Sequence, residues 1–119
     1  MGRLLGVSVV AAILAVAAFA SAPPVGQLPK GPVTFVQLAV GKTYTVKLPQ
    51  PKVAGRVWRI ARPFDGKVVR ETREAETKQQ VLVSFRTVGK GTTSVIFAMT
   101  LGERSHAYAA HTYRFVIGR

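Results

Sequence analysis

Most of this chain alternates between apolar and polar residues, the pattern of a β-strand that has one face in a protein core. The clearest example is residues 43–48, where Tyr44, Val46 and Leu48 share one face. Residues 93–101, TSVIFAMTL, are apolar on both faces and predict a central strand. The segments that predict strands are 33–40, 43–48, 56–61, 67–73, 79–87, 93–101 and 111–117.

About seven short strands without a helical period predict an all-β domain, an immunoglobulin-like β-sandwich of antiparallel strands. A small closed barrel has the same sequence pattern and stays open as the alternative. Trp58, the only tryptophan, shares one strand face with Ile60. We therefore expect Trp58 to be the large buried side chain against which the other strands pack.

The first 22 residues follow a different pattern: a basic start at Arg3 and a nearly unbroken apolar run from Leu4 to Ala20. This pattern predicts a helical secretory signal peptide at residues 1–20, and hence export to the periplasm or the extracellular space. Cleavage after Ala22 is less favoured, because proline directly after the cut is a poor substrate. An uncleaved membrane anchor is the alternative, because an apolar run of this length can span a bilayer.

Residues 21–32, SAPPVGQLPKGP, are rich in proline and glycine and predict a flexible, extended lead-in to a single domain at residues 33–119. The chain has no cysteine, although an exported protein could form disulfides. Burial of apolar side chains alone must therefore hold the domain together.

The net charge of +12, from 17 Lys and Arg against 5 Asp and Glu, favours acidic partners. Outside the cytoplasm these are anionic envelope polymers, lipid head groups or an acidic protein, and we expect no nucleic-acid partner. The basic residues are scattered along the chain, and such a surface is more often a matter of solubility than a binding site.

Side chains for catalysis are scarce, so we expect no enzyme, no cofactor and no metal site. The chain has no Cys nucleophile, no GxSxG motif and one Asp. Ser105 and His106 are adjacent, so their side chains point apart, and His106 and His111 lack further ligands at metal spacing. The carboxylates Glu71, Glu74 and Glu76 lie among Arg70, Arg73 and Lys78, which predicts surface ion pairs.

Residues 48–60, LPQPKVAGRVWRI, predict a loop held between two core strands. Pro49 and Pro51 each fix φ and lack an N–H, so this stretch cannot form a central ladder. Gly55 can adopt a backbone conformation that a β-carbon would resist.

The spacing of Leu48, Pro49, Gly55 and Trp58, preceded by AVGKTYTVKLP at residues 39–49, resembles the chagasin family of cysteine peptidase inhibitors. In that family three loops at one end of an immunoglobulin-like sandwich wedge into the active-site cleft of papain-like peptidases. The resemblance implies Trp58 as a structural anchor. The peptidase-contacting residues that it implies are Pro51, Lys52, Val53, Ala54, Gly55, Arg56, Thr77, Lys78, Leu101, Gly102, Glu103 and Arg104.

The chain departs from the family at the loop tips. The Asn-Pro-Thr-Thr of the first family loop is replaced by residues 51–54, PKVA, and the glycines of the second loop are missing from residues 74–78. The Arg-Pro-Trp of the third loop corresponds to Leu101, Gly102 and Glu103.

Two functional hypotheses follow. The first is a monomeric, exported inhibitor-like protein that occludes a papain-like active site. The second is a non-inhibitory module that binds anionic envelope polymers or serves a structural role on the same fold, because a fold does not determine a function.

Overall fold

The computed structural model describes residues 24–118, all of whose secondary structure is β-strand. The predicted signal peptide, its cleavage sites and residues 21–23 lie outside the described residues. Among residues 24–118 there is no helix long and apolar enough to cross a membrane. The strands are β1 (Val33–Leu38), β2 (Thr43–Pro49), β3 (Arg56–Ile60), β4 (Val69–Glu76), β5 (Gln80–Thr87), β6 (Gly91–Leu101) and β7 (Ala107–Ile117).

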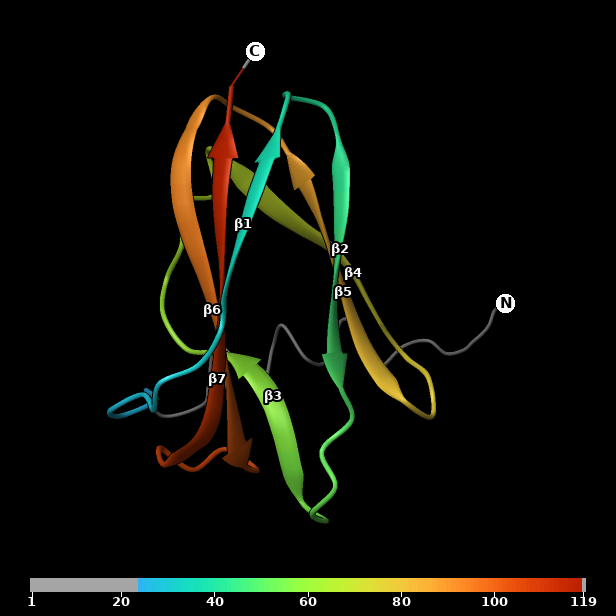
Figure 1. The fold of residues 1–119 in the computed structure, drawn as a ribbon, viewed down its shortest axis with the longest axis vertical. Coiled ribbons are helices and arrows are strands. Elements are labelled where there is room, and N and C mark those ends of the chain that lie inside the picture. The colour runs from blue at the N-terminus through green and yellow to red at the C-terminus, as the bar shows by residue number, and fades with distance from the viewer. Residues whose placement is uncertain (1–23, 119) are drawn as a thin grey trace.

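The strands form two sheets that pack face to face (Figure 1). Sheet A has the order β1-β7-β6-β3, and sheet B has the order β2-β5-β4. The chain crosses from one sheet to the other after β1, β2, β3 and β5. Strands that are consecutive in sequence therefore often lie in different sheets. The predicted immunoglobulin-like sandwich is confirmed. The small closed barrel, which the sequence left open as the alternative, is wrong because the strands form two separate sheets.

One strand pair differs from the predicted antiparallel arrangement. β1 runs parallel to β7, with Val36 opposite Phe115 and Leu38 opposite Ile117. The expectation of antiparallel strands throughout is therefore wrong at this edge. After β1 the chain crosses to sheet B through a turn at Gly41, whose φ is 89°, so no hairpin determines the direction of β1 within its own sheet.

β4 and β7 each extend at least three residues further than their side chains predicted. β4 continues through residues 74–76, which were expected to form a polar connection, and pairs with β5 as far as Glu76 opposite Val81. β7 begins at Ala107, opposite Thr100 of β6, instead of at His111. In both cases the hairpin ladder determines the boundary, because backbone hydrogen bonds do not depend on the polarity of the side chains.

The core lies between the sheets and centres on Phe85 of β5. Its ring centroid lies 5.7 Å from that of Phe115, 5.8 Å from that of Phe64 and 6.3 Å from that of Phe97. Trp58 is only half-buried and packs against the margin of this cluster. The prediction that Trp58 is the large buried side chain against which the other strands pack is therefore wrong, because β3 is an edge strand of sheet A and has a neighbour on one side only.

Residues 24–32 are not a free lead-in but pack on the outer face of sheet A. Val25 is buried against Ala61, Ala98 and Ala107. The Thr112 N–H donates to the Pro32 carbonyl at 2.9 Å, and a β-carbon at Gly31 would collide with the backbone of Ala110. These residues therefore contact the domain, because the small side chains of β6 and β7 leave room for them.

We predict that Phe85→Ala lowers the free energy of unfolding by about 3–5 kcal/mol, because it leaves a cavity that both sheets border. Urea denaturation of the chain from Ser21 onward measures this loss. The matched control is Phe35→Ala on β1, whose side chain is 73% exposed, and its effect should stay within about 0.5 kcal/mol. Equal losses in the two variants would contradict this description of the core.

Candidate functional site

The three loops predicted to contact a peptidase lie at one end of the sandwich, the lower end in Figure 1. The first loop (50–55) joins β2 to β3, the second (77–79) joins β4 to β5, and the third (102–106) joins β6 to β7. Together with the flanking residues Arg56 and Leu101 we call them the loop end. The topology brings all the predicted contact residues to this end.

The first and third loops are joined through the backbone. Arg56 lies opposite Leu101 at the end of the β3–β6 ladder, and the Gly102 N–H donates to the Gly55 carbonyl at 2.9 Å. Gly55 has a φ of 84°, and a β-carbon there would lie 3.2 Å from Cδ1 of Leu101. The glycine requirement read from the sequence is thus confirmed.

Gln50 joins the first loop to the second. Its backbone N–H donates to the Gln79 carbonyl at 2.9 Å. Its side-chain amide Nε2 lies 2.9 Å from both the Glu76 carboxylate and the Thr77 carbonyl. The Thr77 hydroxyl in turn accepts from the Gln80 N–H at 2.9 Å, which closes the turn. The sequence did not predict these contacts of Gln50, because its partners come from the β4–β5 strand pair, which is distant in sequence.

Trp58 supports the base of the first loop. Its indole Nε1–H donates to the Pro49 carbonyl at 2.8 Å, across the loop between β2 and β3. Pro49 is the last residue of β2, so this bond lies where the first loop begins. Trp58 therefore anchors the loop rather than the centre of the core.

Arg59 stabilises the third loop through hydrogen bonds, a role that the sequence did not predict. Although it is charged, it is only 5% exposed. Its Nε donates to the Thr100 hydroxyl at 3.2 Å, and Nη2 donates to the Arg104 carbonyl at 2.8 Å. The Thr100 hydroxyl donates to the Gly102 carbonyl at 2.7 Å. These bonds satisfy loop carbonyls that would otherwise depend on water.

Beside the third loop, Arg56 lies over the ring of Tyr108, with its guanidinium carbon 3.7 Å from the ring centroid. This is a cation–π contact. His106 meets the same ring edge to face at 4.6 Å. The family resemblance implied Arg56 as a site residue, whereas His106 was predicted to have no catalytic or metal-binding role and Tyr108 was not predicted to have any role. No signal in the sequence joins them, because Arg56 lies on β3 and Tyr108 lies on β7.

The tip side chains remain open to solvent. Lys52, Val53, Ala54 and Gly55 are exposed, as are Thr77, Lys78, Glu103 and Arg104, while Pro51, Arg56, Leu101 and Gly102 are half-buried. Three of the exposed large apolar side chains, Val53, Val57 and Tyr108, lie at or beside the loop end.

The predicted surface ion pairs of Glu71, Glu74 and Glu76 are wrong. The three glutamates pair with Phe85, Val83 and Val81 of β5, and directly paired residues share a sheet face. The glutamates therefore point toward sheet A, away from the side of Arg73. Burial, a hydrogen bond to Glu71 and the neighbouring carboxylates raise the pKa of Glu74 to about 9.

The two histidines do not meet in one site. His106 contacts Tyr108 in the third loop, whereas His111 lies within β7, stacked on Tyr113 at 4.4 Å and hydrogen-bonded to Thr34. Burial lowers the pKa of His111. Among residues 24–118 no group of three or more His, Cys, Asp or Glu side chains is placed to hold a metal ion. The arrangement at the loop end is suited to binding through shape and charge.

We predict that Glu74→Gln flattens the pH dependence of stability between pH 4.5 and 9. Folding raises the pKa of this carboxyl, so its contribution to stability is complete below 4.5 and is lost as the pH rises through 9. Glutamine keeps a donor for Glu71 and does not ionise. Thermal unfolding across this pH range measures the effect, with Glu103→Gln in the exposed third loop as control. An unchanged slope in Glu74→Gln would contradict the prediction.

No sequence family model matches the chain, and no curated protein matches it by sequence. Solved structures do match its fold. One is the cysteine protease inhibitor EhICP2 from Entamoeba histolytica, with a TM-score of 0.55, 13% identity, and coverage of 76% of this chain and 99% of that one. Another is PbICP-C in complex with falcipain-2, with a TM-score of 0.55, 9% identity, and coverage of 80% and 93%. The chain therefore has the immunoglobulin-like fold of chagasin-type cysteine protease inhibitors.

Proposed function

We propose that this protein is an exported inhibitor of papain-like cysteine peptidases, acting in the periplasm or the extracellular space. The observation that carries the proposal is the convergence of three cross-linked loops at one end of the sandwich. Two further facts support it: the fold is that of EhICP2, and the similar PbICP-C is found in complex with falcipain-2.

The proposed mechanism is occlusion of the active-site cleft. Val53, Ala54 and Gly55 form the narrow tip of the first loop and approach the peptidase nucleophile. The absence of a side chain at Gly55 lets the backbone come close to it. Lys52 and Arg56 reach toward acidic groups at the rim of the cleft, and the second and third loops contact its two sides.

The cross-links at the loop end favour binding because they limit the entropy lost on association. Gln50 fixes the second loop to the first, and Gly55 fixes the first to the third. The peptidase therefore meets loops whose backbones already have a defined shape. The tip residues differ from those of the family, so the affinity for a given peptidase depends on Val53, Tyr108 and Arg56.

We predict that the chain from Ser21 onward inhibits a papain-like peptidase at micromolar concentration. Gly55→Trp should weaken inhibition by more than about tenfold, because an indole at the tip separates the loop from the cleft and because φ is positive there. The assay is titration of peptidase activity against a fluorogenic peptide. Val53→Trp places the same side chain at the tip without replacing a glycine.

The matched control is Lys90→Trp, in the turn between β5 and β6 at the opposite end of the sandwich. It adds the same side chain and should leave inhibition unchanged. Failure of the chain to inhibit, or equal loss in the tip and control variants, would reject the proposal.

A second candidate function is binding of an anionic envelope polymer, favoured by the net charge of +12. Such binding would weaken steeply with added salt and would not respond to Gly55→Trp. Polymer binding in a protein that fails to inhibit would identify this function in place of the first.

A further inference from the structure

The outer face of sheet A is covered over only part of its area. Residues 24–32 cover the part next to the loop end, where Val25 and Leu28 pack on Ala98 and Ala107. The remaining part, along β1 and the C-terminal half of β7, carries apolar side chains that residues 24–118 leave exposed. Of these, Phe35 is 73% exposed, Val33 51% and Val116 37%.

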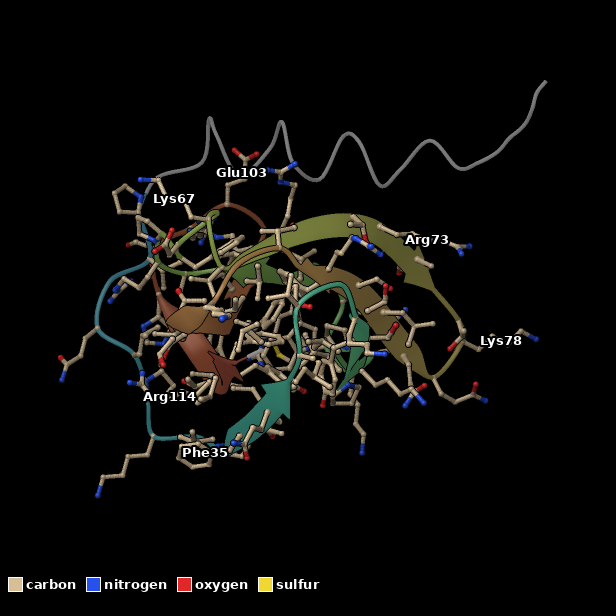
Figure 2. The ribbon with its side chains drawn as sticks, turned by 90° about the horizontal axis from the view of Figure 1, so that it is seen from above. Phe35, Lys67, Arg73, Lys78, Glu103 and Arg114 are labelled. Atoms are coloured by element: carbon tan, nitrogen blue, oxygen red, sulfur yellow. The ribbon has the colours of Figure 1, made fainter. Side chains whose placement is uncertain are left out.

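The strand register places these side chains together. Phe35 lies opposite Arg114, and Gln37 lies opposite Val116, in the parallel pair of β1 and β7. The intervening Val36 and Phe115 point into the core, so their neighbours point outward. Figure 2 shows Phe35 and Arg114 projecting from one side of the sandwich, away from Arg73 and Lys78. We call Val33, Phe35, Arg114 and Val116 the Phe35 face.

The fold does not need an aromatic residue at position 35. A ring with 73% of its surface in water contributes little to the core, and a polar β-former such as threonine would suit the strand equally well. An exposed aromatic side chain beside two valines on one sheet face is instead typical of an interaction surface.

Charge limits what can bind to this face. The five acidic residues, Asp65, Glu71, Glu74, Glu76 and Glu103, all lie outside β1, β6 and β7. The exposed Arg114 donates from Nη1 to the Ser94 hydroxyl at 2.8 Å, which holds its guanidinium over the sheet. Lys30 and Lys42, on either side of β1 in the sequence, are exposed. A second copy of this chain would bring like charges together, whereas an anionic surface would be attracted.

We propose that the Phe35 face docks on an anionic lipid membrane. The phenylalanine ring enters the boundary between head groups and acyl chains, and Arg114 pairs with lipid phosphate. The loops project from the end of the sandwich and not from this side (Figure 1), so they stay accessible while the protein lies on the membrane. This inference does not depend on the proposed function.

The test uses the chain from Ser21 onward, which contains both complete sheets and the core, so that the apolar N-terminal run cannot itself bind lipid. Co-sedimentation with vesicles of phosphatidylglycerol and phosphatidylcholine should show binding that falls with added salt, and vesicles of phosphatidylcholine alone should bind weakly. Phe35→Ser should reduce the affinity about tenfold. Arg114→Gln should reduce it about fivefold.

The matched controls are Val53→Ser at the loop end and Arg73→Gln on sheet B, which make the same kinds of change away from the face. Each should alter the affinity less than about twofold. Because the chain has no cysteine, Phe35→Cys also provides a unique position for an environment-sensitive fluorophore. Its emission should shift to the blue on addition of anionic vesicles, and that of a fluorophore at Val53→Cys should not.

Several results would overturn the proposal. Binding that is equally strong in Phe35→Ser would mean that diffuse charge alone attracts the protein. Sedimentation equilibrium that shows a dimer in the parent chain and a monomer in Phe35→Ser would assign the face to self-association. Absence of binding to anionic vesicles at low salt would reject the proposal directly.

Discussion

Apolar packing between two sheets, centred on Phe85, is the interaction on which the whole structure depends. The chain has no cysteine, so no disulfide assists it. Phe85 of sheet B meets Phe97 and Phe115 of sheet A, and this contact fixes the distance and the angle between the layers. All three loops of the loop end are attached to strands whose positions this packing determines. The geometry of the loop end is therefore a property of the core as much as of the loops.

The loop end combines a fixed backbone with free side chains. Polar contacts from Gln50, Trp58 and Arg59 satisfy backbone carbonyls at the base of the loops. The tip residues take part in few of these bonds and remain exposed. Substitution at residues 51–54 therefore changes what the loop end can bind without changing how it is built. This separation explains how the chain keeps the inhibitor fold although its tip residues differ from those of the family.

Six of the seven exposed large apolar side chains among residues 24–118 lie in two regions. Val53, Val57 and Tyr108 lie at or beside the loop end, and Val33, Phe35 and Val116 lie on the outer face of sheet A. The first region suits a concave protein partner and the second a flat anionic surface. Because one lies at the end of the sandwich and the other on its side, both can be occupied in the same molecule.

Several features were determined by local sequence. Alternation of apolar and polar residues predicted the seven strands, because side chains on a strand point to alternate faces whatever their neighbours are. The need for glycine at position 55 was also local, since positive φ excludes a β-carbon. The tertiary structure decided what depends on contacts between distant segments: the parallel pairing of β1, the half-burial of Trp58, the burial of Arg59 and Val25, and the inward direction of Glu74. Each of these follows from which strand lies at a sheet edge and what covers it, and strand order is not encoded in the alternation of any single segment.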